Sequence, residues 1–357
     1  MSKGVNALPI IGSFYIKESK LLEMTNYAFN GSSATSVNIY IDLNSVFNKL
    51  YTSGFDMNAR LGDYEIASAV LNMIAHYRYF FWSKLRVTVT FHFVYSLLNN
   101  NSLKVYYPTY NNTNNTNMVF YKDKFTLITK NLSLLEKIIP YIPDCTITIG
   151  TVEPCVTMKW IMDNINNKNP NILLTKDEVT MQLAAIMNNT VVYVPKKYKG
   201  VDSSYVIVPT NNGLYNALSD KRKCKTYPFS TEISSGLYSL VLSITGAKSR
   251  DITSVISYTS CMKELEKLIL DNKISNTYNS IISNIYNEMN IKYKNTLINS
   301  NIDGRFKSLD LLYQYGIYMN NPERLYFKGI QNLYDPNGVH EICDEYFKEY
   351  PINLERM

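Results

Sequence analysis

The 357-residue sequence is poor in the residues on which most metal and redox sites depend. It contains five cysteines and three histidines. The cysteines are far apart in the chain and form no CxxC pair, and the histidines have no metal-ligand spacing between them. A disulfide framework, a zinc site and histidine-based triad chemistry are therefore disfavoured. This cysteine usage fits a reducing compartment best, so we expect a cytoplasmic protein.

Long apolar runs are also missing. No window approaches the about 18 uncharged apolar residues of a membrane span, so we expect no membrane partner. The apolar run near the N-terminus is too short for a signal peptide. Hydrophobic residues nevertheless make up 46% of the chain and charged residues 18%. That composition is enough for a sizeable core and favours two or three packed units.

The charge balance is modestly basic, with a formal net charge of +6. Such a balance permits a nucleic-acid partner, but solubility alone also explains it. Two basic clusters lie near Tyr198 and Tyr227, which could stack on bases while the cations follow phosphates. The alternative is a solvated loop face. The clusters consist of Lys196, Lys197, Lys199, Lys221, Arg222, Lys223 and Lys225.

Short apolar strand patterns alternate with helical patterns over the first two-thirds of the chain. Strands are predicted at residues 37–41, 86–95, 145–149, 172–175 and 189–195. Helices are predicted at about 64–84, 131–142 and 155–165, and around Met181. This alternation predicts an α/β fold with a mostly parallel sheet covered by helices on both faces. The pattern becomes mainly helical from residue 231.

These patterns divide the chain into four segments. Residues 1–36 are an expected N-terminal extension, and residues 37–230 the α/β domain. Residues 231–290 form a helical region, and residues 291–357 a C-terminal extension whose structure the pattern does not assign. Asp42 follows the first predicted strand, at the edge where open α/β sheets build their sites.

Five short motifs in this order resemble the 5′-nuclease family, the flap endonucleases and 5′–3′ exonucleases of PIN-like fold. The likeness covers about residues 37–270. It rests on IDLNS at Asp42, on Phe91-His92 with YPTY from Tyr107, and on VEPCV at Glu153. The last two motifs are TKDEVTMQL, which contains Asp177, and the LSITGAKSRDI segment from Leu242, which matches the family's helix–three-turn–helix unit.

The resemblance implies hydrolysis of phosphodiesters by two divalent ions bound to clustered carboxylates. By this alignment three acids remain as a reduced metal site: Asp42, Glu153 and Asp177. The family's other acids are replaced by His92, Cys155, Val156, Val179, Ala247 and Arg250. Valine and alanine cannot bind a metal ion, and Arg250 would oppose a cation. Three carboxylates could hold one Mg²⁺ or Mn²⁺, but a second ion is hard to place.

The retained acids have structural readings as well. Asp42 and Asp177 could each cap the helix that follows, and Glu153 before Pro154 suits a helix start. His92 fits a hydrogen-bonded structural residue better than a ligand. Cys155 fits a small buried residue better than a nucleophile. No residue is therefore assigned a catalytic role.

We expect a catalytically inactive 5′-nuclease-like protein. It would serve as a structural or interaction component of a viral nucleic-acid or assembly machine, in the host cytoplasm or the virion. The thirty tyrosines suit protein interfaces, so protein partners are expected and nucleic acid is an open alternative. Two other functions stay open. One is a metal-dependent 5′ nuclease with a reduced site, and the other is a DNA-binding module that does not cut.

Overall fold

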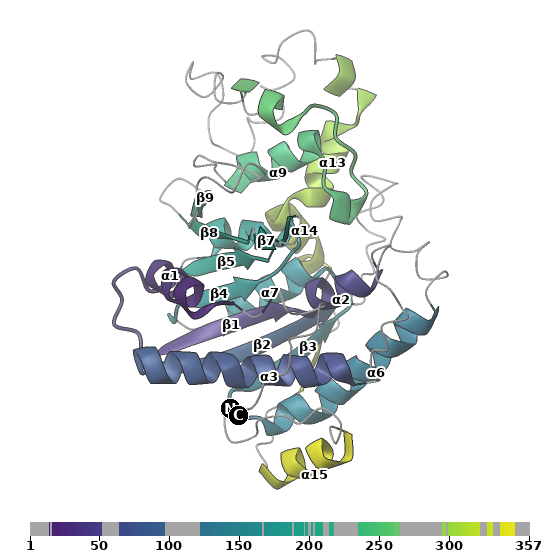
Figure 1. Ribbon diagram of the computed structural model, residues 1–357. Helices are drawn as coiled ribbons and strands as arrows, with labels where there is room; N and C mark the ends of the chain where they lie inside the picture. Colours follow the sequence, from purple (N-terminus) through teal and green to yellow (C-terminus); the bar gives the residue numbers. More distant parts are fainter. Residues whose placement is uncertain are drawn as a thin grey trace.

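The computed structural model describes most of the chain, and its core is a mixed sheet (Figure 1). The described residues are 14, 16–51, 64–96, 122–165, 168–187, 189–195, 197–198, 201–202, 204–209, 214–217, 235–261, 263–264, 295–297, 299–321, 327–330 and 336–346. Within them, eight strands form one sheet in the order β10-β3-β2-β1-β4-β5-β8-β9.

The centre of the sheet is parallel, as the alternating sequence pattern predicts. Its strands are β3 (Cys145–Gly150), β2 (Thr88–Ser96), β1 (Ser36–Asp42), β4 (Asn171–Leu174) and β5 (Thr190–Val194). β1 pairs with β2 on one side and with β4 on the other. The carboxyl ends of β1, β2 and β4 therefore meet at one edge of the sheet, which we call the carboxyl edge.

Antiparallel strands close both sides of this parallel centre. They are β8 (Tyr205–Pro209), β9 (Leu214–Ala217) and β10 (Phe327–Ile330). β8 pairs with β5, and β10 pairs with β3. A separate two-stranded ribbon joins β6 (Lys197–Tyr198) to β7 (Val201–Asp202). The sequence pattern did not predict β10, which lies in the last segment, whose structure the pattern does not assign.

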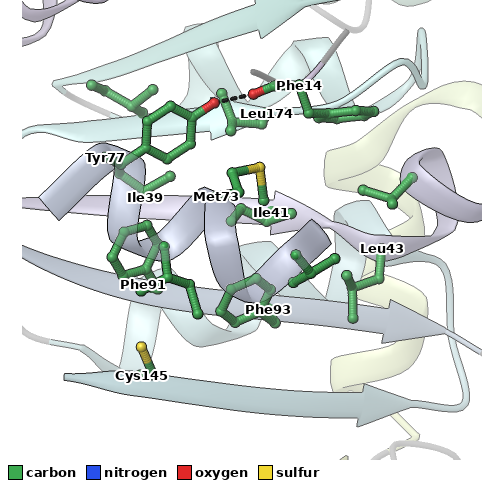
Figure 2. Packing of buried hydrophobic residues seen from close by; sticks show 14 of the residues in the cluster. Phe14, Ile39, Ile41, Leu43, Met73, Tyr77, Phe91, Phe93, Cys145 and Leu174 are labelled. Atoms are coloured by element: carbon green, nitrogen blue, oxygen red, sulfur yellow. Dashed lines mark hydrogen bonds between the residues drawn. The ribbon is translucent and has the colours of Figure 1, made fainter. Parts of the chain in front are cut away.

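One group of helices covers the first face of the sheet. It comprises α1 (Glu18–Phe29), α2 (Leu43–Tyr51), α3 (Glu65–Phe80) and α6 (Lys122–Ile138). A π-helical turn, η2 (Phe81–Leu85), continues α3, and a 3₁₀ turn, η3 (Ile139–Tyr141), continues α6. Ile39 and Ile41 of β1 point into this layer (Figure 2). The Tyr77 hydroxyl of α3 donates to the Phe14 carbonyl, which fixes the segment before α1 on the core.

The second face carries the remaining helices of the sheet region and the C-terminal helices. They are α7 (Pro154–Asn164), η4 (Thr180–Gln182), α8 (Leu183–Ile186), α9 (Ser235–Thr245), α13 (Ile302–Leu309) and α14 (Leu311–Met319). Tyr40 lies between Ile39 and Ile41, but its side chain packs into the hydrophobic cluster on the second face, because successive side chains of a strand point to opposite faces of the sheet. The helix α15 (Pro336–Tyr346) lies against α6, one of the helices that cover the first face.

The end segments take part in the same structure. α1, from the segment expected as an extension, places Leu21 and Met24 in the core of the first face. β10, from the last segment, joins the central sheet. The four-segment division stays a proposal for how the chain is organised. α1 and β10 show that parts of the first and last segments pack with the α/β domain. None of the helices in the described ranges is both long enough and apolar enough to cross a membrane.

Candidate functional site

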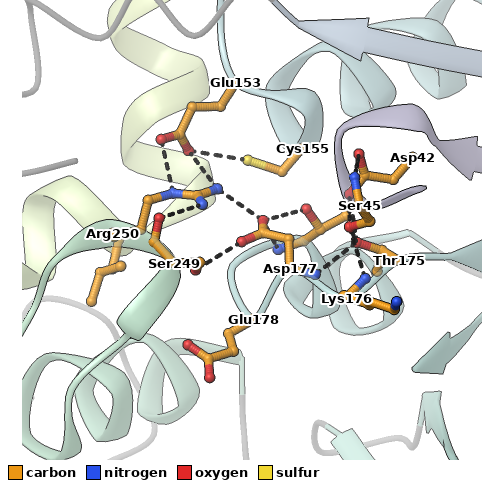
Figure 3. A network of polar contacts seen from close by, with 12 residues as sticks. Asp42, Ser45, Glu153, Cys155, Thr175, Lys176, Asp177, Glu178, Ser249 and Arg250 are labelled. Carbon is orange, nitrogen blue, oxygen red and sulfur yellow. Dashed lines mark hydrogen bonds and ion pairs between the residues drawn. The ribbon is translucent and has the colours of Figure 1, made fainter. Parts of the chain in front are cut away.

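The three retained acids lie around the carboxyl edge of the sheet (Figure 3). Asp42 is the last residue of β1, Glu153 is the residue before α7, and Asp177 follows β4 by three positions. All three are buried, with exposed fractions of 0%, 0% and 8%. A buried carboxylate is costly unless it is paired or hydrogen-bonded, so the partners of each acid decide what the site can do.

Asp42 is held by hydroxyl groups and by the start of α2. Its Oδ1 accepts from the Ser45 backbone N–H at 3.1 Å, which is an N-cap contact. Its Oδ2 accepts from the hydroxyls of Ser45 at 2.5 Å and Thr175 at 2.7 Å. Burial raises the pKa of Asp42 to about 6; the charge of Asp177 also raises it, and the Ser45 and Thr175 hydrogen bonds lower it.

Asp177 has the most contacts of the three. Its Oδ2 accepts from the Thr180 backbone N–H at 3.0 Å and from the Thr180 hydroxyl at 2.6 Å. The Ser249 hydroxyl lies 3.2 Å from Oδ1. The Arg250 guanidinium reaches Oδ2 at 2.9 Å. Both oxygens of Asp177 are thus already occupied by donors from the protein.

Arg250 also binds Glu153, and it does so with two nitrogens. Its Nε lies 3.0 Å from Oε1, and its Nη2 lies 3.4 Å from Oε2. Arg250 itself is only 5% exposed. A guanidinium between two carboxylates in a buried place supplies a fixed positive charge that no change of pH in the ordinary range removes. The side chain thus neutralises the carboxylates that would otherwise attract a cation.

The loop that carries Arg250 is built tightly. Gly246 has φ +88°, and a Cβ there would lie 2.7 Å from the Ile252 carbonyl oxygen and 2.8 Å from the Ser254 nitrogen. Ala247 and Ile252 then exchange backbone hydrogen bonds of 2.9 and 3.1 Å. The short 3₁₀ turn η5 (Lys248–Arg250) lies inside this closed loop. Its backbone thereby directs the Arg250 side chain toward the sheet.

The loop is also held from the other side, by Arg305 of α13. The Arg305 side chain is 6% exposed, and its Nη1 donates to the Thr253 carbonyl at 2.7 Å and to the Ser243 carbonyl at 3.4 Å. The C-terminal helices therefore contact the loop directly. Arg250 and Arg305 together link the sheet, the loop and α13 in one continuous chain of polar contacts.

A two-metal carboxylate centre does not fit this arrangement. Glu153 and Asp177 share the Arg250 cation, and the positions that the resemblance aligns with further acids hold buried Val156, Val179 and Ala247. Among the described residues, no group of three or more His, Cys, Asp or Glu side chains is arranged to hold a metal ion. The donor set suits an arginine and hydroxyl groups rather than hard cations.

The other predicted site residues are distributed as follows. His92 is buried on β2, stacked on Tyr40, with Nδ1 2.9 Å from the Thr146 hydroxyl; burial lowers its pKa to about 4. Cys155 is buried with its sulfur 3.5 Å from Glu153, and burial raises its pKa. Lys197 lies in β6, and its side chain is not described. The other six basic residues, Lys196, Lys199, Lys221, Arg222, Lys223 and Lys225, lie outside the described residues.

Sequence reasoning missed the hydroxyl groups of this site. Ser45, Thr175, Thr180 and Ser249 all contact an acid, yet none was singled out. Ser45 stands three residues after Asp42, the spacing of an N-cap contact, so that signal was readable. Thr175 directly follows a strand that neighbours β1, and its contact becomes visible only once the strand order is known.

No protein-family model matches the sequence, and no curated protein matches it. Solved structures are similar in fold. A bacteriophage T5 D15 flap endonuclease pseudo-enzyme–product complex with DNA and metal ions has a TM-score of 0.50 at 10% identity and covers 86% of this chain and 98% of its own. The T5 D15 protein co-crystallised with metal ions has a TM-score of 0.51 at 9% identity, covering 88% and 100%.

A third structure, the T5 5′-exonuclease with bound zinc, has a TM-score of 0.50 at 11% identity and covers 87% of this chain and 98% of its own. These sequence identities are too low to assign the activity of the phage proteins to this chain. In each case, however, the structural match covers nearly the whole length of the phage protein. The covered share of this chain is also larger than residues 37–270, which carry the sequence motifs. The chain therefore has the PIN-like α/β fold of the flap endonucleases and 5′-exonucleases.

Proposed function

We propose that this protein is a catalytically inactive member of the 5′-nuclease fold that acts as a structural or interaction component of a viral nucleic-acid or assembly machine. The observation that carries the proposal is the double ion pair of Arg250 with Glu153 and Asp177. In two-metal hydrolysis, cations between carboxylates activate water and stabilise the leaving oxygen. Here a guanidinium lies between two of the carboxylates, and it cannot lower the pKa of a bound water as a metal does.

The energetics support a permanent exchange of metal for arginine. A divalent ion would have to displace Arg250 from two carboxylates, and the guanidinium would then stay buried without a partner. The loop around Gly246 restrains its backbone from moving away. Arg250 thus links the loop to the sheet without a metal.

The direct test is an assay of 5′-flap and nicked DNA with Mg²⁺ or Mn²⁺. We expect no cleavage by the wild-type protein. The Asp42→Ala variant is the control, because a contaminating nuclease would be unaffected by that change. Metal-dependent cleavage by the wild type that Asp42→Ala abolishes would show that the protein is a working nuclease.

Calorimetric titration with Mn²⁺ gives a second test that does not depend on activity. We expect the wild type to take up no ion at millimolar concentration. The Arg250→Ser variant leaves Glu153 and Asp177 without their cation, so we expect this variant to bind Mn²⁺. The double variant Arg250→Ser/Asp177→Ala should lose that binding. Uptake by the wild type that is lost in Asp177→Ala would contradict the proposal.

DNA binding without cleavage is a compatible second function. It is supported by the fold likeness to a flap endonuclease solved as a complex with DNA. Binding through phosphate contacts would weaken steeply with salt. Charge reversal across Lys221–Lys225 should then reduce affinity for branched or single-stranded DNA. Unchanged binding would remove that cluster from the interface.

A further inference from the structure

The opposite edge of the sheet, where β1 and β2 begin, carries a second unusual feature. α3 ends there in the π-helical turn η2, and the chain then enters β2. π-helical turns are rare and are frequently found at functional sites. This turn belongs to a different part of the molecule from the acids of the candidate site, since β1 and β2 are parallel and the acids lie at their carboxyl ends.

The turn ends at a residue with an unusual backbone. Arg86 has φ +56° and ψ +36°, the left-handed region that side chains other than glycine seldom adopt. Its N–H bonds back to the Phe81 and Trp82 carbonyls. In the same turn Phe81 is completely buried, while Trp82, the next residue, is 56% exposed. The turn therefore places a tryptophan at the surface, four residues before the left-handed Arg86.

Trp82 is part of a small patch with one further aromatic residue and two basic residues. Tyr79, one turn earlier, is 50% exposed, and Lys84 and Arg86 are exposed as well. The Arg86 guanidinium lies over the Trp82 ring, 5.6 Å from its centroid. Tryptophan, tyrosine and arginine are the residues most enriched among those that dominate protein–protein binding energy. We call Tyr79, Trp82, Lys84 and Arg86 the tryptophan patch.

Acidic residues are absent from the stretch of sequence that carries the patch. The sequence contains no Asp or Glu between Glu65 and Asp123, a stretch that includes α3, η2 and β2. The acid on the neighbouring element is Asp144, beside β3, where Arg78 also donates to the Pro143 carbonyl. Within the part of the chain that the structure describes, the Arg86 and Lys84 side chains have no carboxylate partner.

We propose that the tryptophan patch binds an acidic segment of a partner protein, with an apolar side chain against Trp82 and carboxylates on Arg86 and Lys84. A guanidinium held over a ring keeps its N–H edges for a carboxylate, which it binds in a two-pronged way. Arg86 covers one face of Trp82, which leaves the other face for a partner. The residue types of the patch are those of protein–protein hot spots, and a stacked nucleic-acid base is the alternative that the test below includes. The inference stands whether or not the site at the carboxyl edge cleaves DNA.

The chain has two tryptophans, which allows a direct test. In a Trp160→Phe background, Trp82 is the only source of tryptophan fluorescence. Three probes are titrated: a short Glu/Leu peptide, a Lys/Leu peptide of the same length, and oligothymidylate. We expect a saturable change in emission with the Glu/Leu peptide only.

Charge-reversal variants complete the test. Arg86→Glu and Lys84→Glu should each weaken binding of the Glu/Leu peptide by about tenfold, which corresponds to about 1.4 kcal/mol. Lys263→Glu, an equal charge change at another exposed lysine, should leave it unchanged. Because Arg86 has an unusual backbone, Lys84→Glu keeps the test valid if Arg86→Glu fails to fold. A response to oligothymidylate instead, no response to any probe, or equal affinity in Lys84→Glu would overturn the proposal.

Discussion

Arg250 and Glu153 form a two-nitrogen ion pair across 97 positions of sequence, with Nε 3.0 Å from Oε1. Glu153 is completely buried, and the same guanidinium also holds Asp177. A pair buried this deeply repays the cost of desolvation only when all its hydrogen bonds are made. The relationship explains how two buried carboxylates are tolerated at this edge of the sheet, since one guanidinium balances both.

The first prediction concerns removal of this cation. Arg250→Met leaves Glu153 and Asp177 buried without their counter-charge, so we expect a loss of about 3–5 kcal/mol in the free energy of unfolding. Urea denaturation measures the loss. Combining Arg250→Met with Glu153→Gln and Asp177→Asn removes the stranded charges and should restore part of the stability.

Lys307→Met is the matched control for Arg250→Met. Lys307 pairs with Asp303 at 2.8 Å on the surface of α13, and both side chains are partly exposed. An exposed pair of this spacing contributes about 0.3–0.5 kcal/mol, so its loss should hardly move the urea midpoint. Equal effects of the two substitutions would mean that Arg250 does not balance a buried charge.

The second prediction is a pH dependence caused by Asp42. Burial raises its pKa from 3.8 to about 6. The folded protein therefore holds this proton more tightly than the unfolded chain does. The stabilisation is complete below the unfolded pKa and is lost as the pH rises through about 6; at 1.36 kcal/mol per unit it amounts to about 3 kcal/mol.

Asp42→Asn isolates this contribution, since asparagine can still accept from the Ser45 N–H but does not ionise. We expect the stability of the wild type relative to Asp42→Asn to fall between about pH 4 and pH 7, as the folded-state pKa requires. Urea titrations at several pH values give the difference. His92, whose pKa is lowered to about 4, acts in the opposite direction and cancels in the comparison. A difference that does not vary with pH would contradict the assignment.

The third prediction compares two glycines. Gly246→Ala puts a Cβ 2.7 Å from the Ile252 carbonyl oxygen at a φ of +88°, and the neighbouring atoms are backbone. We expect destabilisation of about 3 kcal/mol, from strain and overpacking together. Gly316 lies in α14 with nothing within 4 Å of its added Cβ. Gly316→Ala should stabilise by roughly 0.5–1 kcal/mol, as alanine does inside a helix.

If Gly246→Ala were tolerated like Gly316→Ala, the loop would not restrain Arg250. Thermal denaturation of both variants distinguishes these outcomes. A second readout is Mn²⁺ titration of Gly246→Ala, because a displaced loop would withdraw Arg250 and free the carboxylates. Uptake of the ion by this variant but not by the wild type would connect the loop to the charge balance of the site.

The parts of the fold that follow from local pattern were predictable from the sequence. Val37–Ile41 shows the buried-strand pattern, and β1 forms there. The five parallel strands were confirmed in this way, as were α3 and α7. The helix predicted at 131–142 begins earlier, at Lys122, and α2 was not assigned a range from the sequence. β10 and α14 were not predicted, because each depends on partners far along the chain: β10 pairs with β3, and α14 packs on α7.

The site was predictable to a similar extent. The motifs picked out Asp42, Glu153, Asp177 and the substitution at Arg250, all of which lie in one polar network. Pattern alone could not show that Arg250 contacts two of these acids, since the direction of a side chain depends on the loop that carries it. From the sequence we expected Arg250 to oppose a bound cation. The structure adds that Arg250 pairs with the carboxylates of Glu153 and Asp177.

The fourth prediction concerns Gln182, which joins the C-terminal helices to the sheet region. Its side chain is 1% exposed. Its Nε2 donates to the Leu309 carbonyl at 2.7 Å, and its Oε1 accepts from the Ser239 hydroxyl at 2.9 Å and the Leu311 N–H at 3.0 Å. One amide thus contacts α9, the end of α13 and the start of α14.

Gln182→Leu keeps the volume but leaves the Leu311 N–H and the Leu309 carbonyl without this partner. Each buried unsatisfied group costs about 1–3 kcal/mol, so we expect a loss of roughly 2–4 kcal/mol. Hydrogen exchange should show faster exchange in α13 and α14 than in β1, because the lost bonds lie at the junction of those helices. Equal acceleration in β1 and α14 would mean that Gln182 stabilises the whole fold and does not specifically hold the C-terminal helices.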